Sequence, residues 1–280
     1  MENCFDIKVK GITNVWFYTF IKISVLFLFV FIHSCKKDAE TSAIIETGTV
    51  TDIDGNVYKT VKIGRLWWMA ENLKVKRYRN GDSIRNLRDI KGNIDSAKWN
   101  HTITGAYFIY DSRDTTSPNY NGKKFGFLYN WYAISNAGNI APVGWHIPSD
   151  DEWKELEIYV GMDKDDANKV NWRGTDEGNK LKIQYSPEKQ VSWTKPSDQF
   201  KVYGTNESGF SALGGGCVMY NGILGVPGAN STGFWWTASE QGSEAWYRYL
   251  DYQKANVFRF YGSKTYGFSV RCVQDSFINE

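Results

Sequence analysis

The sequence is poor in the side chains that most often carry enzyme chemistry. Its 280 residues include 3 histidines and 4 cysteines, and 33 lysines and arginines nearly balance 31 aspartates and glutamates. His33 lies in an apolar leader, which leaves His101 and His146 as candidates for a zinc ligand or a histidine-activated nucleophile. The near-neutral charge argues against nucleic acid as a partner. We expect no catalytic residue, no metal and no cofactor.

Long apolar runs are also missing. Residues 23–32 form an uncharged, mostly apolar run of ten, whereas a helix that spans a bilayer needs about 20 residues. Lys8, Lys10 and Lys22 precede the run, an order that is typical of secretory signal peptides. The pattern predicts export from the cytoplasm, with residues 1–34 as the signal peptide.

The end of this leader, Ile32-His33-Ser34-Cys35, resembles the lipobox of bacterial lipoproteins. The resemblance implies that Cys35 is acylated, becomes the new N-terminus and anchors the chain in a membrane. Because the residues after it are small and polar, we interpret 35–47 as a lipidated tether. Lys36-Lys37-Asp38 resembles the export tags of Bacteroidetes surface lipoproteins, which implies the outer membrane, with the domain at the cell surface or facing the periplasm. The alternatives are an uncleaved N-terminal anchor helix and cleavage by an ordinary signal peptidase.

Two cysteines remain for the folded region. Cys4 leaves with the signal peptide and Cys35 takes the lipid, so Cys217 and Cys272 are left. An even number of cysteines in an oxidising compartment suggests a disulfide between them. Two buried thiols are the alternative.

Local signals mark one hairpin and two helices. Asp54-Gly55 interrupts the alternating apolar residues of 49–63, which predicts a β-hairpin; a calcium loop, the alternative, would need a closing Glu that is absent. Ser149 followed by Glu152 is a capping box and predicts the start of a helix. A second helix is expected over about 164–181, with a break at Trp172-Arg173-Gly174 as the alternative.

The other segments divide into core, loops and strands. Residues 125–134, FGFLYNWYAI, are expected in the core, and 79–124 as long surface loops with a short strand near Tyr107. Further strands are expected over 217–220, 234–239, 245–251, 257–261 and 268–273.

Several short motifs are spread along the folded region. They are Asp52-Ile53-Asp54-Gly55-Asn56, Trp67-Trp68-Met69-Ala70-Glu71-Asn72-Leu73, Tyr129-Asn130-Trp131-Tyr132-Ala133, Gly144-Trp145-His146-Ile147-Pro148-Ser149, Gly209-Phe210-Ser211-Ala212, Phe234-Trp235-Trp236-Thr237-Ala238-Ser239 and Val270-Arg271-Cys272-Val273. Together these motifs resemble one family, the Fibrobacter succinogenes major paralogous domain of secreted and lipid-anchored bacterial proteins. The resemblance covers residues 48–275 and leaves 276–280 as a tail.

The resemblance implies an α+β fold of the C-type lectin-like kind, similar to formylglycine-generating enzymes. Such a domain has twisted antiparallel strands, two helices and long loops. The copper-binding cysteine pair of those enzymes is absent here, since Cys217 and Cys272 lie far apart in sequence, and so are the tripeptides by which C-type lectins bind calcium and sugar. Neither activity is therefore expected, and a fold alone does not fix a function.

The aromatic residues favour a binding function. Tryptophans occur as adjacent pairs in strand-like segments, and neighbours on a strand point to opposite faces. We therefore predict that Trp68, Trp236 and Trp246 present rings to a ligand, a glycan or a surface protein; burial of both faces is the alternative. The expected function is non-catalytic ligand binding by an envelope lipoprotein. The alternatives are an enzyme of the same fold with unidentified chemistry and a structural component of the envelope.

Overall fold

The computed structural model describes residues 45–88, 93–109, 121–184, 193, 204–219, 223–224 and 230–276. The expected signal peptide, Cys35 and most of the tether therefore lie outside the described residues. Within the described ranges, no helix is long and apolar enough to cross a membrane.

The predicted N-terminal hairpin is confirmed. Strand β1 (Thr47–Thr51) pairs antiparallel with β2 (Val57–Ile63), which continues into β3 (Leu66–Met69). Asp52 closes the turn by accepting the backbone N–H groups of Asp54 and Asn56, each at 2.9 Å, while Gly55 adopts the positive φ of 79° that favours glycine. With β15 (Val273–Gln274) and β7 (Trp145–His146) these strands form a sheet in the order β1-β2-β3-β15-β7.

Two further sheets complete the architecture, and strands predominate over helices. One sheet has the order β10-β9-β14-β6-β5-β4 and the other the order β11-β12-β13-β8. All pairings except β4 with β5 are antiparallel. The strands are β4 (Arg85–Asn86), β5 (Ala106–Phe108), β6 (Leu128–Asn130), β8 (Asn171–Arg173), β9 (Val218–Met219), β10 (Ile223–Leu224), β11 (Thr232–Gln241), β12 (Glu244–Asp251), β13 (Val257–Ser263) and β14 (Gly267–Phe268). The strand expected over 268–273 is thus divided between β14 and β15.

The helix with the capping box is confirmed, whereas the second segment is not one helix and follows the alternative of a break near Trp172-Arg173-Gly174. Helix α5 (Asp150–Tyr159) begins after Ser149, whose side chain accepts the N–H of Glu152 while Glu152 reaches back. The segment expected as one helix divides into α6 (Lys164–Asn168), β8 and α7 (Glu177–Leu181). Asn171 and Gly174, with φ of 67° and 75°, take left-handed conformations that a helix cannot continue through.

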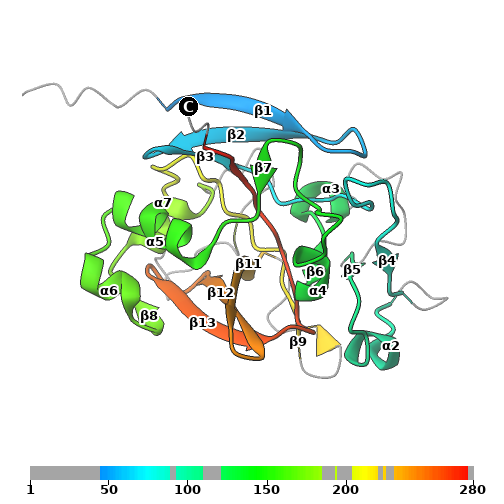
Figure 1. Cartoon of the computed structure of the whole chain (residues 1–280). Helices are drawn as coiled ribbons and strands as arrows, with labels where there is room; N and C mark the ends of the chain where they lie inside the picture. The colour runs from blue at the N-terminus through cyan, green and yellow to red at the C-terminus, as the bar shows by residue number, and fades with distance from the viewer. Residues whose placement is uncertain are drawn as a thin grey trace, which may run out of the picture. The chain divides into compact units, whose positions relative to one another are not determined.

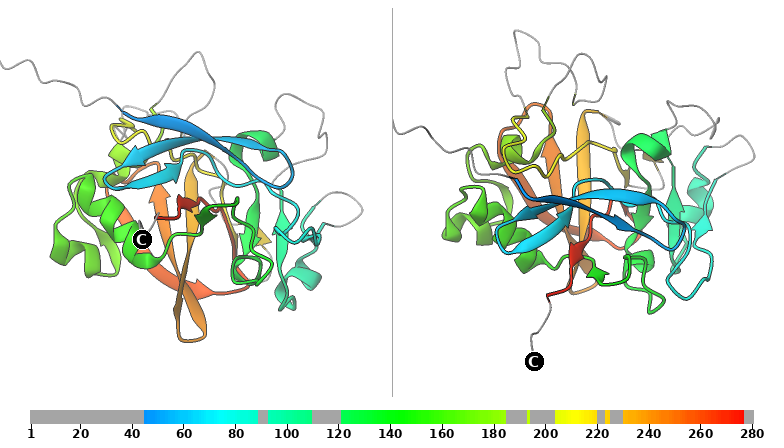
Figure 2. Two further views of the ribbon diagram at one scale, coloured as in Figure 1. Left: turned by 45° about the horizontal axis from the view of Figure 1, so that its top comes forward. Right: turned by 90° about the horizontal axis from the view of Figure 1, so that it is seen from above.

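Three short helices were not predicted, so the expectation of two helices is too low. They are α2 (Ser96–Asn100), α3 (Asn121–Phe125) and α4 (Trp131–Ile134). In Figures 1 and 2, α5–α7 lie together beside β8 and β13, whereas α2–α4 lie with β4–β6 on the other side.

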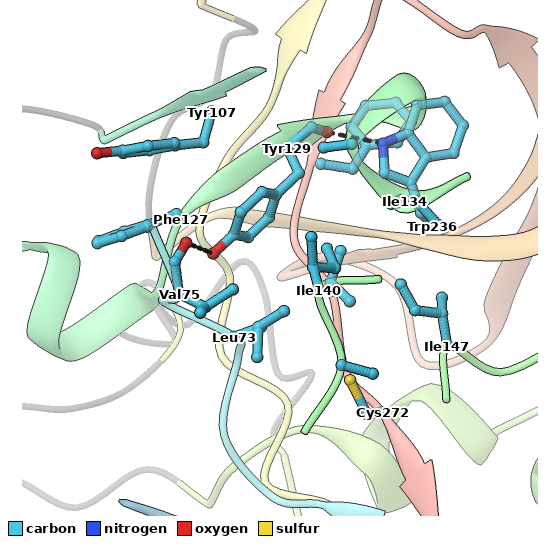
Figure 3. Close-up of a cluster of buried hydrophobic side chains, with 14 of the residues drawn as sticks. Leu73, Val75, Tyr107, Phe127, Tyr129, Ile134, Ile140, Ile147, Trp236 and Cys272 are labelled. Carbon is cyan, nitrogen blue, oxygen red and sulfur yellow. Dashed lines mark hydrogen bonds between the residues drawn. The ribbon is translucent and has the colours of Figure 1, made fainter. Parts of the chain in front are cut away.

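The core has two main clusters, and residues 125–134 contribute to it as predicted. Trp235 belongs to one cluster and Trp236 to the other, since neighbours on β11 point to opposite sides. Figure 3 shows how Tyr129 connects residues of the cluster that contains Trp236. Its hydroxyl donates to Val75 O at 2.7 Å, and its carbonyl accepts a hydrogen bond from Trp236 Nε1 at 2.9 Å. Such partners let polar aromatic groups lie in a core.

The predicted disulfide is wrong. Cys217 and Cys272 both belong to the core cluster that contains Trp236, and no disulfide joins them in the described part of the chain; Figure 3 shows Cys272. Burial raises the pKa of the Cys272 thiol well above its usual value. An even number of cysteines shows that a disulfide is possible in an oxidising compartment. It does not show that the two backbone positions are close enough to be joined, which explains the error.

Candidate functional site

Two of the three tryptophans proposed as ligand contacts are buried. Trp68 and Trp236 have 0% exposure. Trp68 packs edge-to-face against Trp153 at 5.2 Å, and Trp236 lies 4.4 Å from Phe268 between ring centroids. The prediction failed for these two because both faces of their sheets are covered. Neighbouring side chains on a strand still point to opposite faces, but each face packs against other parts of the core.

Trp246 keeps part of its surface. It is half-buried on β12, the Arg259 guanidinium lies 3.7 Å from its ring centroid, and Tyr261 meets it edge-to-face at 5.1 Å. Trp68 and Trp236 belong to different core clusters, and Trp246 belongs to neither. The structure therefore does not bring the three rings together in one cleft.

A buried ion cluster lies beneath Trp246 and was missed from the sequence. Arg248 is 0% exposed; its Nη1 lies 2.7 Å from Asp150 Oδ1 and its Nε 2.7 Å from Glu157 Oε1. Arg259 and Arg173 add contacts to Asp150 and Glu157, at 2.7 and 2.5 Å. Burial alone would raise the pKa of the Asp150 carboxyl, but the hydrogen bonds and charges of Arg259 and Arg248 outweigh it and hold that pKa well below its usual range. These acids are thus committed to structural ion pairs.

His146 lies in an open polar groove of about 750 Å³ between β7 and the start of α5. Its Nε2 lies 2.9 Å from Glu152 Oε1 and its Nδ1 2.6 Å from Asp275 Oδ1. The hydrogen bond with Glu152 raises the pKa of the imidazole, burial opposes this, and Asp275 adds to the rise. The two carboxylates flank the ring on its two nitrogens instead of converging with it, and no metal-binding group of such side chains occurs among the described residues.

A second groove of about 750 Å³, which we call the hairpin groove, lies between the β1–β2 turn and α3. Its lining includes three lysines, from the segment after β3 and from α3, together with one acid and two apolar side chains. The lining residues are Asp54, Asn56, Val57, Lys74, Lys76, Gly122, Lys123 and Phe127. Figure 1 shows α3 beside the tip of the β1–β2 hairpin, which explains how segments far apart in sequence share one groove.

The walls of the hairpin groove are held by a polar network. The Tyr58 hydroxyl donates to Asp52 Oδ2 at 2.5 Å and accepts the backbone N–H of Lys74 at 3.0 Å. Burial, followed by the bond to Asp52, raises the pKa of Tyr58 well above its usual value, so this hydroxyl stays a donor. The Asn56 amide donates to Asp52 as well, at 2.8 Å. The turn and the lysine segment are thereby fixed relative to each other.

Sequence reasoning missed the hairpin groove because its parts are distant along the chain. Lys74 and Lys76 alternate with the fully buried Leu73 and Val75, which is a local signal that both lysines face outward from one extended segment. Nothing local indicates that Lys123 joins them.

Comparison with known proteins identifies the family. The Fibrobacter succinogenes major domain (Fib_succ_major) matches residues 61–274. No curated protein and no solved structure matches the chain. The matched residues cover most of the chain and contribute strands to each of the three sheets, although β1 and the start of β2 lie before the match. The chain therefore belongs to the Fibrobacter succinogenes major domain family.

Proposed function

We propose that this chain is a cell-envelope lipoprotein whose domain binds an extracellular ligand in the hairpin groove without chemical conversion. The lipid is carried by Cys35, and the domain lies outside the cytoplasm, at the outer membrane. The proposal also assigns the curled antiparallel sheets and short helices to a C-type lectin-like fold.

The hairpin groove is the observation that carries the proposal. Its volume of about 750 Å³ falls in the range of about 300–1,000 Å³ that is usual for ligand sites. The Asp52–Tyr58 network holds the β1–β2 turn against the segment that carries Lys74, so binding need not order these two parts of the groove, and preorganisation of this kind favours affinity.

The engagement of acids and histidine elsewhere supports binding over catalysis. Asp150 and Glu157 are paired with arginines, and His146 is held by two carboxylates. A catalytic acid or base has to be within reach of a substrate proton. The side chains of Asp150, Glu157 and His146 are already hydrogen-bonded to structural partners.

A blocked groove tests the proposal. Val57 is 56% exposed and lines the hairpin groove, so Val57→Trp fills the groove without entering the core. Val143, which is 83% exposed and lines neither 750 Å³ groove, provides the matched control, Val143→Trp. We expect glycan arrays or pull-downs from microbial and host surfaces to give a ligand whose affinity falls at least about tenfold in Val57→Trp and stays unchanged in Val143→Trp. Blank arrays and blank pull-downs, or a ligand indifferent to Val57→Trp, would refute this function.

A further inference from the structure

We infer that the hairpin groove takes an acidic glycan, a sugar chain that carries carboxylate or sulfate groups, with Lys74, Lys76 and Lys123 as the groups that recognise its charge. This inference rests on the proposed function and names the ligand class for the same groove.

The charge of the groove is the first step. Six lysines elsewhere in the described residues have a carboxylate within 3.3 Å: Lys62, Lys98, Lys154, Lys169, Lys180 and Lys264. Lys74, Lys76 and Lys123 have no carboxylate partner in the part of the chain that the structure describes. Three of the lysines without a carboxylate partner therefore lie together in one concave site.

The acid in the groove does not cancel this charge. Asp54 Oδ1 lies 2.6 Å from Arg77 Nε, and Asp54 Oδ2 accepts the backbone N–H of Lys76 at 2.5 Å. Asp54 and Arg77 neutralise each other, which leaves the three ammonium groups as the net charge of the described lining residues. Low-dielectric walls focus such a field and attract an anion.

The position of Lys74 favours a specific site over a diffuse basic surface. Its backbone N–H is held by Tyr58, and its Nζ lies 5.1 Å from the centroid of the Tyr58 ring. A cation–π contact of this kind limits the rotamers of the side chain, so less entropy is lost when an anion binds.

The shape and lining favour a glycan over an acidic protein. Protein partners use aromatic and arginine anchors in fairly flat interfaces, whereas small ligands use concave sites. Among the described residues, the groove lining contains neither Trp, Tyr nor Arg; it offers a concave volume, the Asn56 side chain and a small apolar wall of Val57 and Phe127. Polar groups suit hydroxyls, and an apolar wall suits the C–H face of a sugar ring.

The test compares four probes by calorimetry on the lipid-anchored protein in detergent. The probes are an oligogalacturonate, a heparin-derived oligosaccharide, a neutral xylo-oligosaccharide and an oligoglutamate peptide of similar length. We expect one or both acidic glycans to bind. Tighter binding of the oligogalacturonate would indicate recognition of carboxylates, and tighter binding of the heparin-derived oligosaccharide would indicate recognition of sulfates. The affinity should fall when salt rises from about 0.05 to about 0.5 M, because exposed charges are then screened.

Matched variants assign the binding to the three lysines. The triple variant Lys74→Gln, Lys76→Gln, Lys123→Gln should weaken acidic-glycan binding on the order of thirtyfold, from three partly exposed charge contacts. Lys164→Gln removes one exposed, unpaired lysine from α6 and should leave the affinity unchanged. Unaltered melting temperatures would show that the variants are folded.

The outcomes separate this inference from the proposed function. The inference is overturned if the neutral oligosaccharide binds as tightly as the acidic ones, if oligoglutamate binds as tightly, or if the triple variant binds like the wild type. It is overturned as well if no acidic glycan binds. In each of these cases a different ligand that is sensitive to Val57→Trp would leave the binding function standing, and the lack of any such ligand would remove both.

Discussion

Arg248 shows how a single buried charge is made tolerable. Its guanidinium is fully buried, and it bridges Asp150 on the first turn of α5 and Glu157 two turns later, so it ties β12 to the length of the helix. Taking charges out of water is expensive, and only good geometry with several hydrogen bonds offsets the cost. Arg173 is less well satisfied: its Nε and Nη1 have no partner, and burial lowers its pKa.

This contrast predicts unequal effects of two arginine substitutions. Arg248→Met should destabilise the domain by about 3–5 kcal/mol, because Asp150 and Glu157 would lose a partner that both share. Arg173→Met should cost clearly less, since Glu157 keeps Arg248 and the cluster of two acids and three arginines becomes neutral. Urea unfolding of the two variants measures the difference; equal losses would show that the cluster is not organised around Arg248.

At the scale of elements, α5 is fixed at its start. Ser149 and Glu152 form the capping box, and Glu152 also meets His146 on β7, which in turn meets Asp275 after β15. Burial would raise the pKa of Glu152, but the hydrogen bond of His146 and those of Ser149 lower it overall. A single imidazole thus links a helix N-terminus to the C-terminal strand.

This link predicts a pH-dependent stability. The raised pKa of His146 means that its contribution is full below the ordinary value of 6.5 and is lost as pH rises through the folded-state pKa. The lowered pKa of Glu152 means that its contribution is full above 4.5 and is lost as pH falls through its folded-state pKa. Stability from the link should therefore be greatest between about pH 4.5 and 6.5.

His146→Gln should flatten this part of the profile. We expect a modest loss of about 0.5–1 kcal/mol near pH 6, since the imidazole is 39% exposed and its ion pairs are screened. The loss should shrink as the pH rises through the raised pKa of His146, because the wild-type imidazole then loses its charge. Melting curves across pH measure it, with His101→Gln as the control. A loss that does not change with pH would mean that His146 acts through packing alone.

The elements also show what local sequence can predict. The turn at Asp54-Gly55 and the capping box at Ser149 depend on a few adjacent residues, and both are where the pattern places them. The sequence offered a break at Trp172-Arg173-Gly174 as an alternative, but its start at Asn171 was not predicted, because left-handed conformations of Asn are favoured only weakly by local chemistry. The burial of Trp68 and Trp236 depends on sheets and loops from remote parts of the chain. The alternation of side chains along one strand does not indicate which of its faces those remote parts cover.

For the whole molecule, the proposed lipid anchor decides where the domain works. The described residues from Ile45 on belong to one compact unit, and the lipobox pattern precedes it in the sequence. If Cys35 carries the lipid, this unit starts about ten residues beyond the membrane surface, and each residue of an extended tether adds at most about 3.6 Å. A tether of that length keeps the domain close to the envelope and near polymers anchored there.

Cys35→Ala tests the location directly. We expect the wild-type protein to incorporate radiolabelled palmitate, to sediment with the outer membrane and to lack residues 1–34 by mass spectrometry. Cys35→Ala should lose the label and the mature N-terminus at residue 35, because no thiol is left to acylate. Cys4→Ala is the matched control and should behave as the wild type, since Cys4 lies within the proposed signal peptide. Recovery of an unlabelled wild-type chain from the cytosol with residues 1–34 intact would remove the lipid anchor, and with it the encounter between the hairpin groove and an extracellular acidic glycan.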